Sequence, residues 1–219
     1  MLALFDIDGT LLLRASEAHR DAVHEALLEV YGVDAPVSAR VEAAGRTDLE
    51  IAREMCLLSG VSAERFDAGR DDFRAACVAA YARLCPPDLS AHVAPGIVAV
   101  LEALTARDDV LLALLTGNLE PIARLKVARA GVGRFFAPGQ GGFGSDSEDR
   151  TDLPAIARRR AGGHPRADTV VIGDTPRDIA CARADGVRCV AVATGPYGAH
   201  ALAGADAVVD SAHDLLAVL

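Results

Sequence analysis

The chain has 219 residues, of which 51% are hydrophobic and 24% charged, as expected for a soluble globular protein of one large domain or one domain with an insertion. Its net charge is −9 and it has no basic stripe with interleaved aromatics, so no nucleic-acid partner is expected. No apolar run approaches membrane-spanning length, so no membrane partner is expected either. The five cysteines form no Cys-x-x-Cys pair, which predicts reduced, mostly buried thiols in a cytoplasmic protein.

The first predicted element is a buried strand, Leu2–Phe5. The residues that follow, 16–89, contain no convincing strand and read as three helices. These are Ala18–Val30, Leu49–Leu58 and Ala63–Leu84. More than seventy residues is far too long for an ordinary connection between a strand and the next helix. The sequence therefore predicts an inserted, all-helical cap domain over residues 15–90.

Strands and helices alternate in the remainder of the chain. The predicted strands are Val110–Leu115, Thr169–Ile172, Val187–Val192 and a weaker Ala207–Val209. The predicted helices are Pro95–Ala106, Leu119–Ala130 and Pro176–Ala184. The glycine-rich segment 139–145 is predicted to be a loop. This alternation predicts an α/β core, a Rossmann-like, mostly parallel sheet covered on both faces, formed by residues 1–14 and 91–219.

A first motif, Asp6-Ile7-Asp8-Gly9-Thr10, follows the first strand directly. Ligands bind at the carboxyl ends of strands in open α/β sheets, and a turn at Gly9 lets both carboxylates converge on one point. A cation there would keep both ionised, so that one attacks phosphorus while the other moves a proton. The alternative is an acidic turn that only caps the next helix.

The second motif, Thr116-Gly117-Asn118, ends the second core strand. A hydroxyl and free backbone N–H groups at the start of a helix can hold an anion. Such a tripeptide is also a common turn, with Asn118 as a helix N-cap.

The third motif, Gly173-Asp174-Thr175-Pro176-Arg177-Asp178, ends another strand. Asp174 stands where the strand stops, and Asp178 falls in the first turn of the helix. Oxygen-rich surroundings with no histidine favour Mg²⁺ over zinc. Capping of the helix by acidic residues is the alternative interpretation.

Together the three motifs resemble those of the haloacid dehalogenase (HAD) superfamily, and the helical insertion resembles its first-type cap. The resemblance implies a nucleophile at Asp6 and a general acid and base at Asp8, whose backbone carbonyl joins the metal shell. It further implies phosphoryl binding by Thr116, Gly117 and Asn118. The Mg²⁺ ligands it implies are Asp6, Asp8, Asp174 and Asp178.

The sequence departs from the family's pattern at one point. The family's lysine stands before a proline, upstream of the last motif. Arg150 occupies the comparable stretch, and Lys126 is the only lysine in the chain. Lys126 lies about 12 Å along its helix from Thr116, and its long side chain can lean back that far. Lys126 is the favoured phosphate ligand, with Arg150 as the rival.

Arg46, between two cap helices, is a candidate substrate ligand that could pair with a carboxylate or hydroxyl. A solvated Arg46 beside a capping Thr47 is equally consistent with the sequence. The histidines form no ligand-like cluster and receive no role.

The resemblance implies a Mg²⁺-dependent phosphatase that hydrolyses a small phosphorylated metabolite, similar to phosphoglycolate, through an aspartyl-phosphate. A sugar phosphomutase is the first alternative. A 2-haloacid dehalogenase is disfavoured because the dehalogenases of this superfamily lack the second aspartate, here Asp8. A non-catalytic binding protein is a further alternative. A monomer or homodimer is expected.

Overall fold

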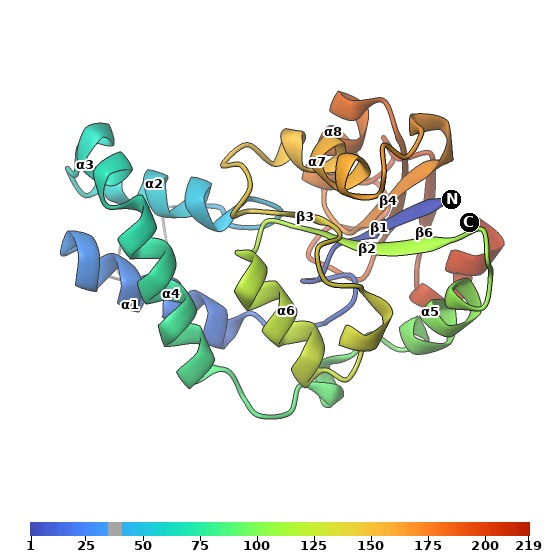
Figure 1. The fold of residues 1–219 in the computed structure, drawn as a ribbon, viewed down its shortest axis with the longest axis horizontal. Coiled ribbons are helices and arrows are strands. Elements are labelled where there is room, and N and C mark those ends of the chain that lie inside the picture. The colour runs from blue at the N-terminus through green and yellow to red at the C-terminus, as the bar shows by residue number, and fades with distance from the viewer. Residues whose placement is uncertain (35–40) are drawn as a thin grey trace.

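A computed structural model describes residues 1–34 and 41–219. In these residues a six-stranded, wholly parallel sheet has the strand order β3-β2-β1-β4-β5-β6 (Figure 1). Its strands are β1 (Leu2–Phe5), β2 (Leu111–Thr116), β3 (Gly142–Phe143), β4 (Thr169–Gly173), β5 (Arg188–Val192) and β6 (Ala207–Val209). The predicted α/β class and Rossmann-like parallel sheet are confirmed.

Strand β1 lies in the middle of the sheet. Phe5 pairs in register with Leu114 of β2 and Ile172 of β4, and every residue of β1 is buried. A strand buried on both faces needs a continuous apolar run, and Leu2–Phe5 supplies one. Because the three central strands run in the same direction, their carboxyl ends meet at one edge of the sheet.

Helices cover both faces of the sheet (Figure 1). One face carries α5 (Ile97–Thr105) and α6 (Glu120–Arg129), and the other carries α7 (Leu153–Arg160) and α8 (Pro176–Asp185). Successive strand side chains point to opposite faces, so the core divides in two. Ala3 and Phe5 pack with α5 and α6, and Leu2 and Leu4 pack with α7 and α8.

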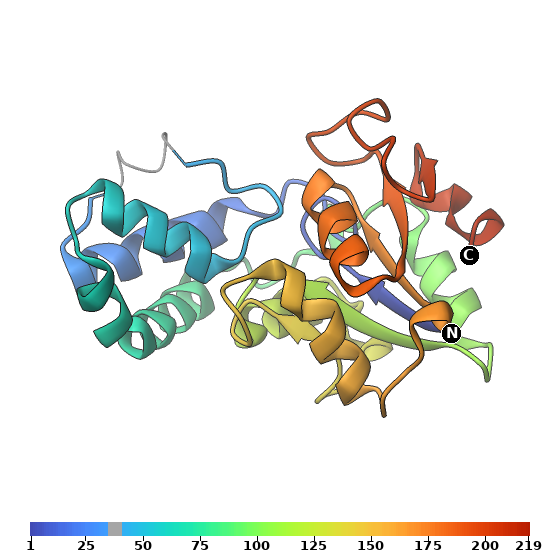
Figure 2. The same ribbon diagram turned by 90° about the horizontal axis from the view of Figure 1, so that it is seen from above.

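Four helices between β1 and β2 lie together beside the sheet, at the end remote from both chain termini (Figures 1 and 2). They are α1 (Glu17–Tyr31), α2 (Asp48–Leu58), α3 (Ala63–Ala68) and α4 (Arg70–Leu84). The ring of Tyr31 stacks on Phe66 with centroids 5.5 Å apart, and its hydroxyl donates to the Phe66 carbonyl at 2.9 Å. We call these four helices and their connecting loops the cap.

The structure corrects three sequence predictions. The single helix predicted over residues 63–84 is two helices, broken at Gly69, where a Cβ would come within 2.8 Å of the Tyr31 ring. The segment predicted as a loop contains β3, whose Phe143 pairs with Thr116. Helix α7 was not predicted, because its eight residues end in three consecutive arginines and carry little apolar periodicity.

The cap rests directly on the core through hydrogen bonds to backbone carbonyls of the core. Asp48 N donates to the Gly117 carbonyl at 2.8 Å, and the Thr47 hydroxyl donates to the Glu148 carbonyl at 2.7 Å. A Cβ added at Gly117 would lie 2.0 Å from the Arg46 carbonyl oxygen. Only glycine therefore permits this approach of cap and core.

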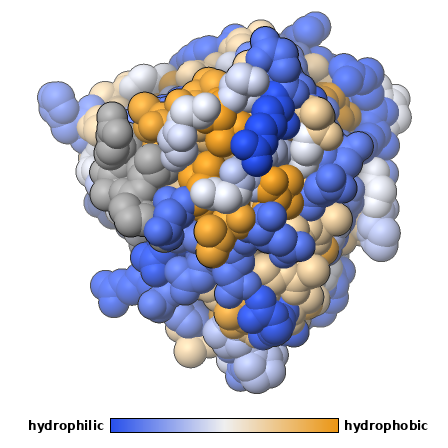
Figure 3. Space-filling model, turned by 90° about the vertical axis from the view of Figure 1, so that its left-hand side faces the viewer, coloured by the Kyte–Doolittle hydropathy of each residue, from blue (hydrophilic) through white to orange (hydrophobic). Residues whose placement is uncertain are grey.

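The surface at the cap end is mostly hydrophilic, with an apolar patch among the polar residues (Figure 3). Over residues 1–34 and 41–219, no helix combines the length and apolarity needed to cross a membrane. All five cysteines are buried and unpaired, as predicted.

Replacing Gly117 by alanine should force the cap away from the core. Backbone atoms must shift to admit the methyl group, at a cost of about 1–3 kcal/mol, or roughly 2–12 °C in Tm for a chain of this size. Small-angle scattering should also record a larger radius of gyration. Gly198→Ala is the matched control, because nothing lies within 4 Å of its added Cβ. Unchanged Tm and scattering for G117A would contradict the tight contact.

Candidate active site

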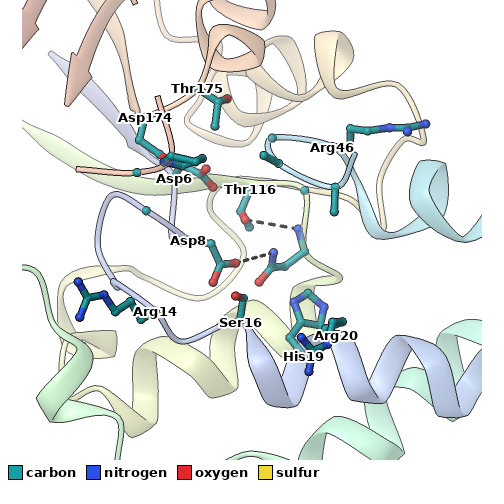
Figure 4. Close-up of a pocket in the computed structure, with 18 of the residues that line it drawn as sticks. Asp6, Asp8, Arg14, Ser16, His19, Arg20, Arg46, Thr116, Asp174 and Thr175 are labelled. Atoms are coloured by element: carbon teal, nitrogen blue, oxygen red, sulfur yellow. Dashed lines mark hydrogen bonds between the residues drawn. The ribbon is translucent and has the colours of Figure 1, made fainter. Parts of the chain in front are cut away.

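The three sequence motifs meet at the carboxyl edge of the sheet. Asp6 follows β1, Thr116 ends β2 and Asp174 follows β4, and Figure 4 shows their side chains gathered at one side of a cavity. Carboxylate oxygens of Asp6, Asp174 and Asp178 all lie within 4.8 Å of one another. Asp6 and Asp174 are thus neighbours in space, although they lie 168 positions apart in the sequence.

Two glycines make room for Asp174. A Cβ at Gly9 would lie 2.1 Å from the Asp174 carboxylate, and one at Gly195 would lie 1.7 Å from it. Gly9 also has φ of 89°, which disfavours any side chain. The Thr10 hydroxyl donates to Asp174 at 3.2 Å, so the carboxylate is held in a narrow cradle.

Asp178 is fixed by the start of α8. It forms a capping box with Thr175, whose hydroxyl donates to Asp178 Oδ2 at 2.7 Å. Its other carboxylate oxygen accepts a hydrogen bond from Arg150, whose guanidinium also lies 3.2 Å from Asp6 Oδ2. Arg150 therefore bridges the nucleophile predicted from the first motif and an acid of the third.

The crowded carboxylates perturb one another. Burial raises the pKa of Asp6 to about 6, against the pull of the Arg150 guanidinium. Burial also raises the pKa of Asp174 to about 8, helped by the negative charges of Asp6 and Asp178. One guanidinium does not neutralise three buried carboxylates, which retain an unbalanced negative charge.

This cluster has the chemistry of a site for a hard divalent cation. Its donors are carboxylate oxygens alone, and they converge on one point. Such a donor set suits Mg²⁺. The residues that would hold the ion are Asp6, Asp174 and Asp178, together with the backbone carbonyl of Asp8 predicted from the sequence.

Lys126 is directed to Asp8. Its ammonium is fully buried and lies 2.8 and 2.6 Å from the two Asp8 oxygens and 3.1 Å from His19 Nδ1. An ammonium has three N–H donors, and here three acceptors match them. Lys126 thus has no donor left over for a phosphoryl oxygen in this arrangement.

His19 links this lysine to the cap. Because an ammonium only donates, the Nδ1 of His19 accepts from it, and Nε2 carries the proton toward Asp48 Oδ2 at 3.1 Å. Asp48 in turn accepts from Leu119 N at 2.8 Å. No role for His19 or Asp48 was predicted from the sequence. Their positions along the chain do not indicate that the two side chains would meet.

Asp8 has a second partner in Asn118, whose amide donates to it at 3.1 Å (Figure 4). Burial disfavours the charged form of Asp8, but Lys126 outweighs it, so the pKa of Asp8 lies below its ordinary value. Asp6 and Asp8, two residues apart, thus have pKa values shifted in opposite directions. Opposed shifts in one site are typical of groups with different roles in proton and group transfer.

The remaining predicted ligands line the same cavity, whose volume is about 1190 Å³. Thr116, Gly117 and Asn118 lie on its core side. Arg46 lies on its cap side, but its guanidinium pairs with Glu54 and, at 2.8 Å, with Glu50. Figure 4 shows this side chain pointing away from Asp6 and Asp8.

Comparison with known families agrees with this site. The family model of haloacid dehalogenase-like hydrolases matches residues 3–183, and a second, HAD-hydrolase-like model matches residues 152–215. The chain belongs to the haloacid dehalogenase-like hydrolase family, and the resemblance inferred from its motifs is confirmed. The protein is therefore an enzyme of a hydrolase family. A search of curated protein sequences found no match.

Several solved structures share the fold. A beta-phosphoglucomutase from Clostridium difficile superposes with a TM-score of 0.69 at 17% identity, covering 98% of this chain and 92% of that one. A predicted phosphoglycolate phosphatase from Haemophilus somnus 129PT gives 0.64 at 18%, covering 99% and 96%. CbbY from Rhodobacter sphaeroides, in complex with phosphate, gives 0.60 at 24%, covering 98% and 95%.

The stability of the metal-free protein should fall as the pH rises. The folded protein holds protons on Asp6 and Asp174 that the unfolded chain, with pKa values of 3.8, has already released. The stabilisation present below about pH 4 is therefore lost as the pH passes about 6 and then about 8. Mg²⁺ at a hundred times its Kd should restore about 2.7 kcal/mol, raising Tm more near pH 8 than near pH 6. Differential scanning fluorimetry measures both effects.

Asp174→Asn should weaken both the pH dependence and the Mg²⁺ response. Asp109→Asn, which changes an exposed carboxylate paired with Arg107, should leave both intact. An equal Mg²⁺ response in the wild type and D174N would show that the ion binds elsewhere.

The Lys126–Asp8 pair can be measured by a double-mutant cycle. Lys126→Met leaves Asp8 without its cation. The effects of Lys126→Met and Asp8→Asn on the free energy of unfolding should therefore not be additive. Unfolding by urea of K126M, Asp8→Asn and the double variant should give a coupling free energy of about 0.5–3 kcal/mol. Additive effects would mean that the pair contributes nothing to the fold.

Proposed function

We propose that the protein is a Mg²⁺-dependent phosphatase that hydrolyses a phosphate monoester through an aspartyl-phosphate on Asp6. The observation that carries this proposal is the separation of two neighbouring carboxylates into different environments. Asp6 lies with Arg150 and the acidic cluster, whereas Asp8 lies with Lys126 and Asn118. A nucleophile and a proton carrier need just such a division.

In this proposal Asp6 attacks the phosphorus in line, and the bond to the ester oxygen breaks. Because Lys126 favours the ionised form of Asp8, the proton for this step has to arrive with the ester in its monoanionic form. Asp8 passes that proton to the departing oxygen and then takes one from the water that hydrolyses the aspartyl-phosphate. The ionised Asp8 favoured by Lys126 is the form required for that second step. When bound, the metal ion would offset the charge of the phosphoryl group and keep the cluster ionised.

Arg150 is the cation that we propose beside the phosphoryl oxygens, because it lies 3.2 Å from Asp6 and lines the cavity. The favoured role of Lys126 as a phosphate ligand remains a prediction. Its saturated contacts support a different role, in which it holds Asp8 in place. Thr116, Gly117 and Asn118 remain the proposed donors to the phosphoryl group from the core side.

A sugar phosphomutase is the second candidate, since a beta-phosphoglucomutase shares the fold. The same aspartyl-phosphate would then return its phosphoryl group to a sugar. Asp8 continues to disfavour a dehalogenase. Three further predictions remain: a phosphoglycolate-like substrate, a cytoplasmic location, and a monomeric or homodimeric state. The unpaired cysteines favour the cytoplasmic location.

The phosphatase proposal is tested by two variants of the first motif. With Mg²⁺ and p-nitrophenyl phosphate, Asp6→Asn should abolish phosphate release and leave no phosphoprotein. The Asp8→Asn protein should still be phosphorylated, because the p-nitrophenolate group leaves without a proton. Hydrolysis of the resulting aspartyl-phosphate should slow by about 10²–10⁴-fold. Mass spectrometry of the D8N protein should then find one phosphoryl group, on the peptide that contains Asp6.

Detection of the phosphoryl group on another residue, or full activity of D6N, would overturn the mechanism. Incubation with a sugar 1-phosphate and a bisphosphate primer separates the two candidates. A phosphatase releases inorganic phosphate, whereas a mutase yields the isomeric sugar phosphate.

A further inference from the structure

The cavity reaches well beyond the phosphoryl site. Its volume of about 1190 Å³ is above the range of roughly 300–1,000 Å³ for pockets that bury a drug-sized ligand. A two-carbon leaving group such as glycolate would fill a small part of it. The space beyond Asp8 can therefore hold a larger group.

Most cations in these walls are already neutralised. Arg46 pairs with Glu50 and Glu54, and Arg20 pairs with Asp21 at 3.0 Å. His19 lies between Lys126 and Asp48, as described above. A substrate carboxylate would have to break one of these contacts before any of these groups could bind it.

Among the arginines that line the cavity, Arg14 is the exception. Within residues 1–34 and 41–219 it forms no ion pair, and it is the one residue other than glycine there with a positive φ, 57°. Figure 4 shows its guanidinium pointing away from Asp8. It is poorly placed to bind an acid group that is only one carbon from the ester oxygen.

Apolar side chains dominate the remaining walls on both sides. The cap contributes Val23, Ile51 and Met55, and the core contributes Leu13, Val93 and Pro95. Val23 and Met55, at 6% and 1% exposed, contribute little of this surface, and most of it comes from the half-buried Leu13, Ile51 and Val93. An alcohol with a hydrocarbon body would displace water from this surface, which favours binding.

We propose that the cavity selects phosphate monoesters whose alcohol has an apolar body, branched or aromatic, and no acid group next to the ester. This inference rests on the proposed phosphatase function. The phosphoryl group lies at Asp6 and Arg150, the ester oxygen faces Asp8, and the apolar body fills the space between α1, α2 and residues 91–95. Phosphoglycolate would bring its carboxylate close to the negative charge of Asp8, whose own cation, Lys126, has no donor left for it.

The test compares kcat/KM for Mg²⁺-dependent phosphate release from ethyl, isobutyl and phenethyl phosphate with that from phosphoglycolate. Burial of each added methylene should raise kcat/KM roughly fourfold, so isobutyl phosphate should exceed ethyl phosphate by at least about tenfold. Phosphoglycolate should fall below ethyl phosphate. A preference for phosphoglycolate, or no gain with apolar size, would overturn the substrate class while leaving the phosphatase intact.

If neither these esters nor p-nitrophenyl phosphate released phosphate, the phosphatase function itself would be overturned, and this inference with it. Ile51→Gln places a polar amide in the cap wall and should lower the ratio of kcat/KM for phenethyl over ethyl phosphate by at least about tenfold. A ratio of two substrates for one preparation is independent of the fraction that is folded.

Leu57→Gln is the matched control on the same helix, because Leu57 is 47% exposed and lies outside the cavity lining. It should leave the ratio unchanged. Equal ratios for I51Q and the wild type would show that this wall does not contact the leaving group.

Discussion

Mutual repulsion of carboxylates at one buried edge of the sheet is the constraint around which this protein is built. Asp6, Asp174 and Asp178 lie within 4.8 Å of one another, and a single guanidinium, that of Arg150, offsets them in part. Such a cluster costs stability unless a cation neutralises it. The glycine cradle, the capping box and the parallel register of β1 and β4 hold the carboxylates in place against that repulsion. Strain of this kind is tolerated where a binding or catalytic role depends on it.

The cap is linked by hydrogen bonds to the other carboxylate of the first motif, that of Asp8. Asp8 is joined through Lys126 and His19 to Asp48 at the start of α2, so a continuous polar chain runs from the core to the cap. Groups in such a network have to be satisfied together, because an unpaired buried member is costly. If the cap moved away, Lys126 would lose the acceptor that His19 provides. The contact of cap and core therefore bears on the environment of the proposed proton carrier.

The sequence contained enough signal for the sheet and for the three motifs. Strand β1 is a continuous apolar run, and the rule that ligands gather at the carboxyl ends of strands brings Asp6 and Asp174 together without further information. The two-residue strand β3 and the arginine-rich helix α7 were missed, because their positions depend on pairing and packing rather than on periodicity. The contact of Lys126 with His19, and that of His19 with Asp48, could not be predicted, since these side chains meet only once the cap is folded. Arg150 was recognised as the rival cation from its place in the chain, but its bridge between Asp6 and Asp178 is a tertiary contact.

The burial of Lys126 has a practical consequence. The chain has one lysine, and in this arrangement none of its side chain is exposed. Amine-directed reagents would then modify the folded protein at its N-terminus, and would reach a second position only in molecules whose cap had swung open or whose core had melted. The number of labels acquired per molecule over time would thus report how often Lys126 becomes accessible, with no probe introduced by mutation.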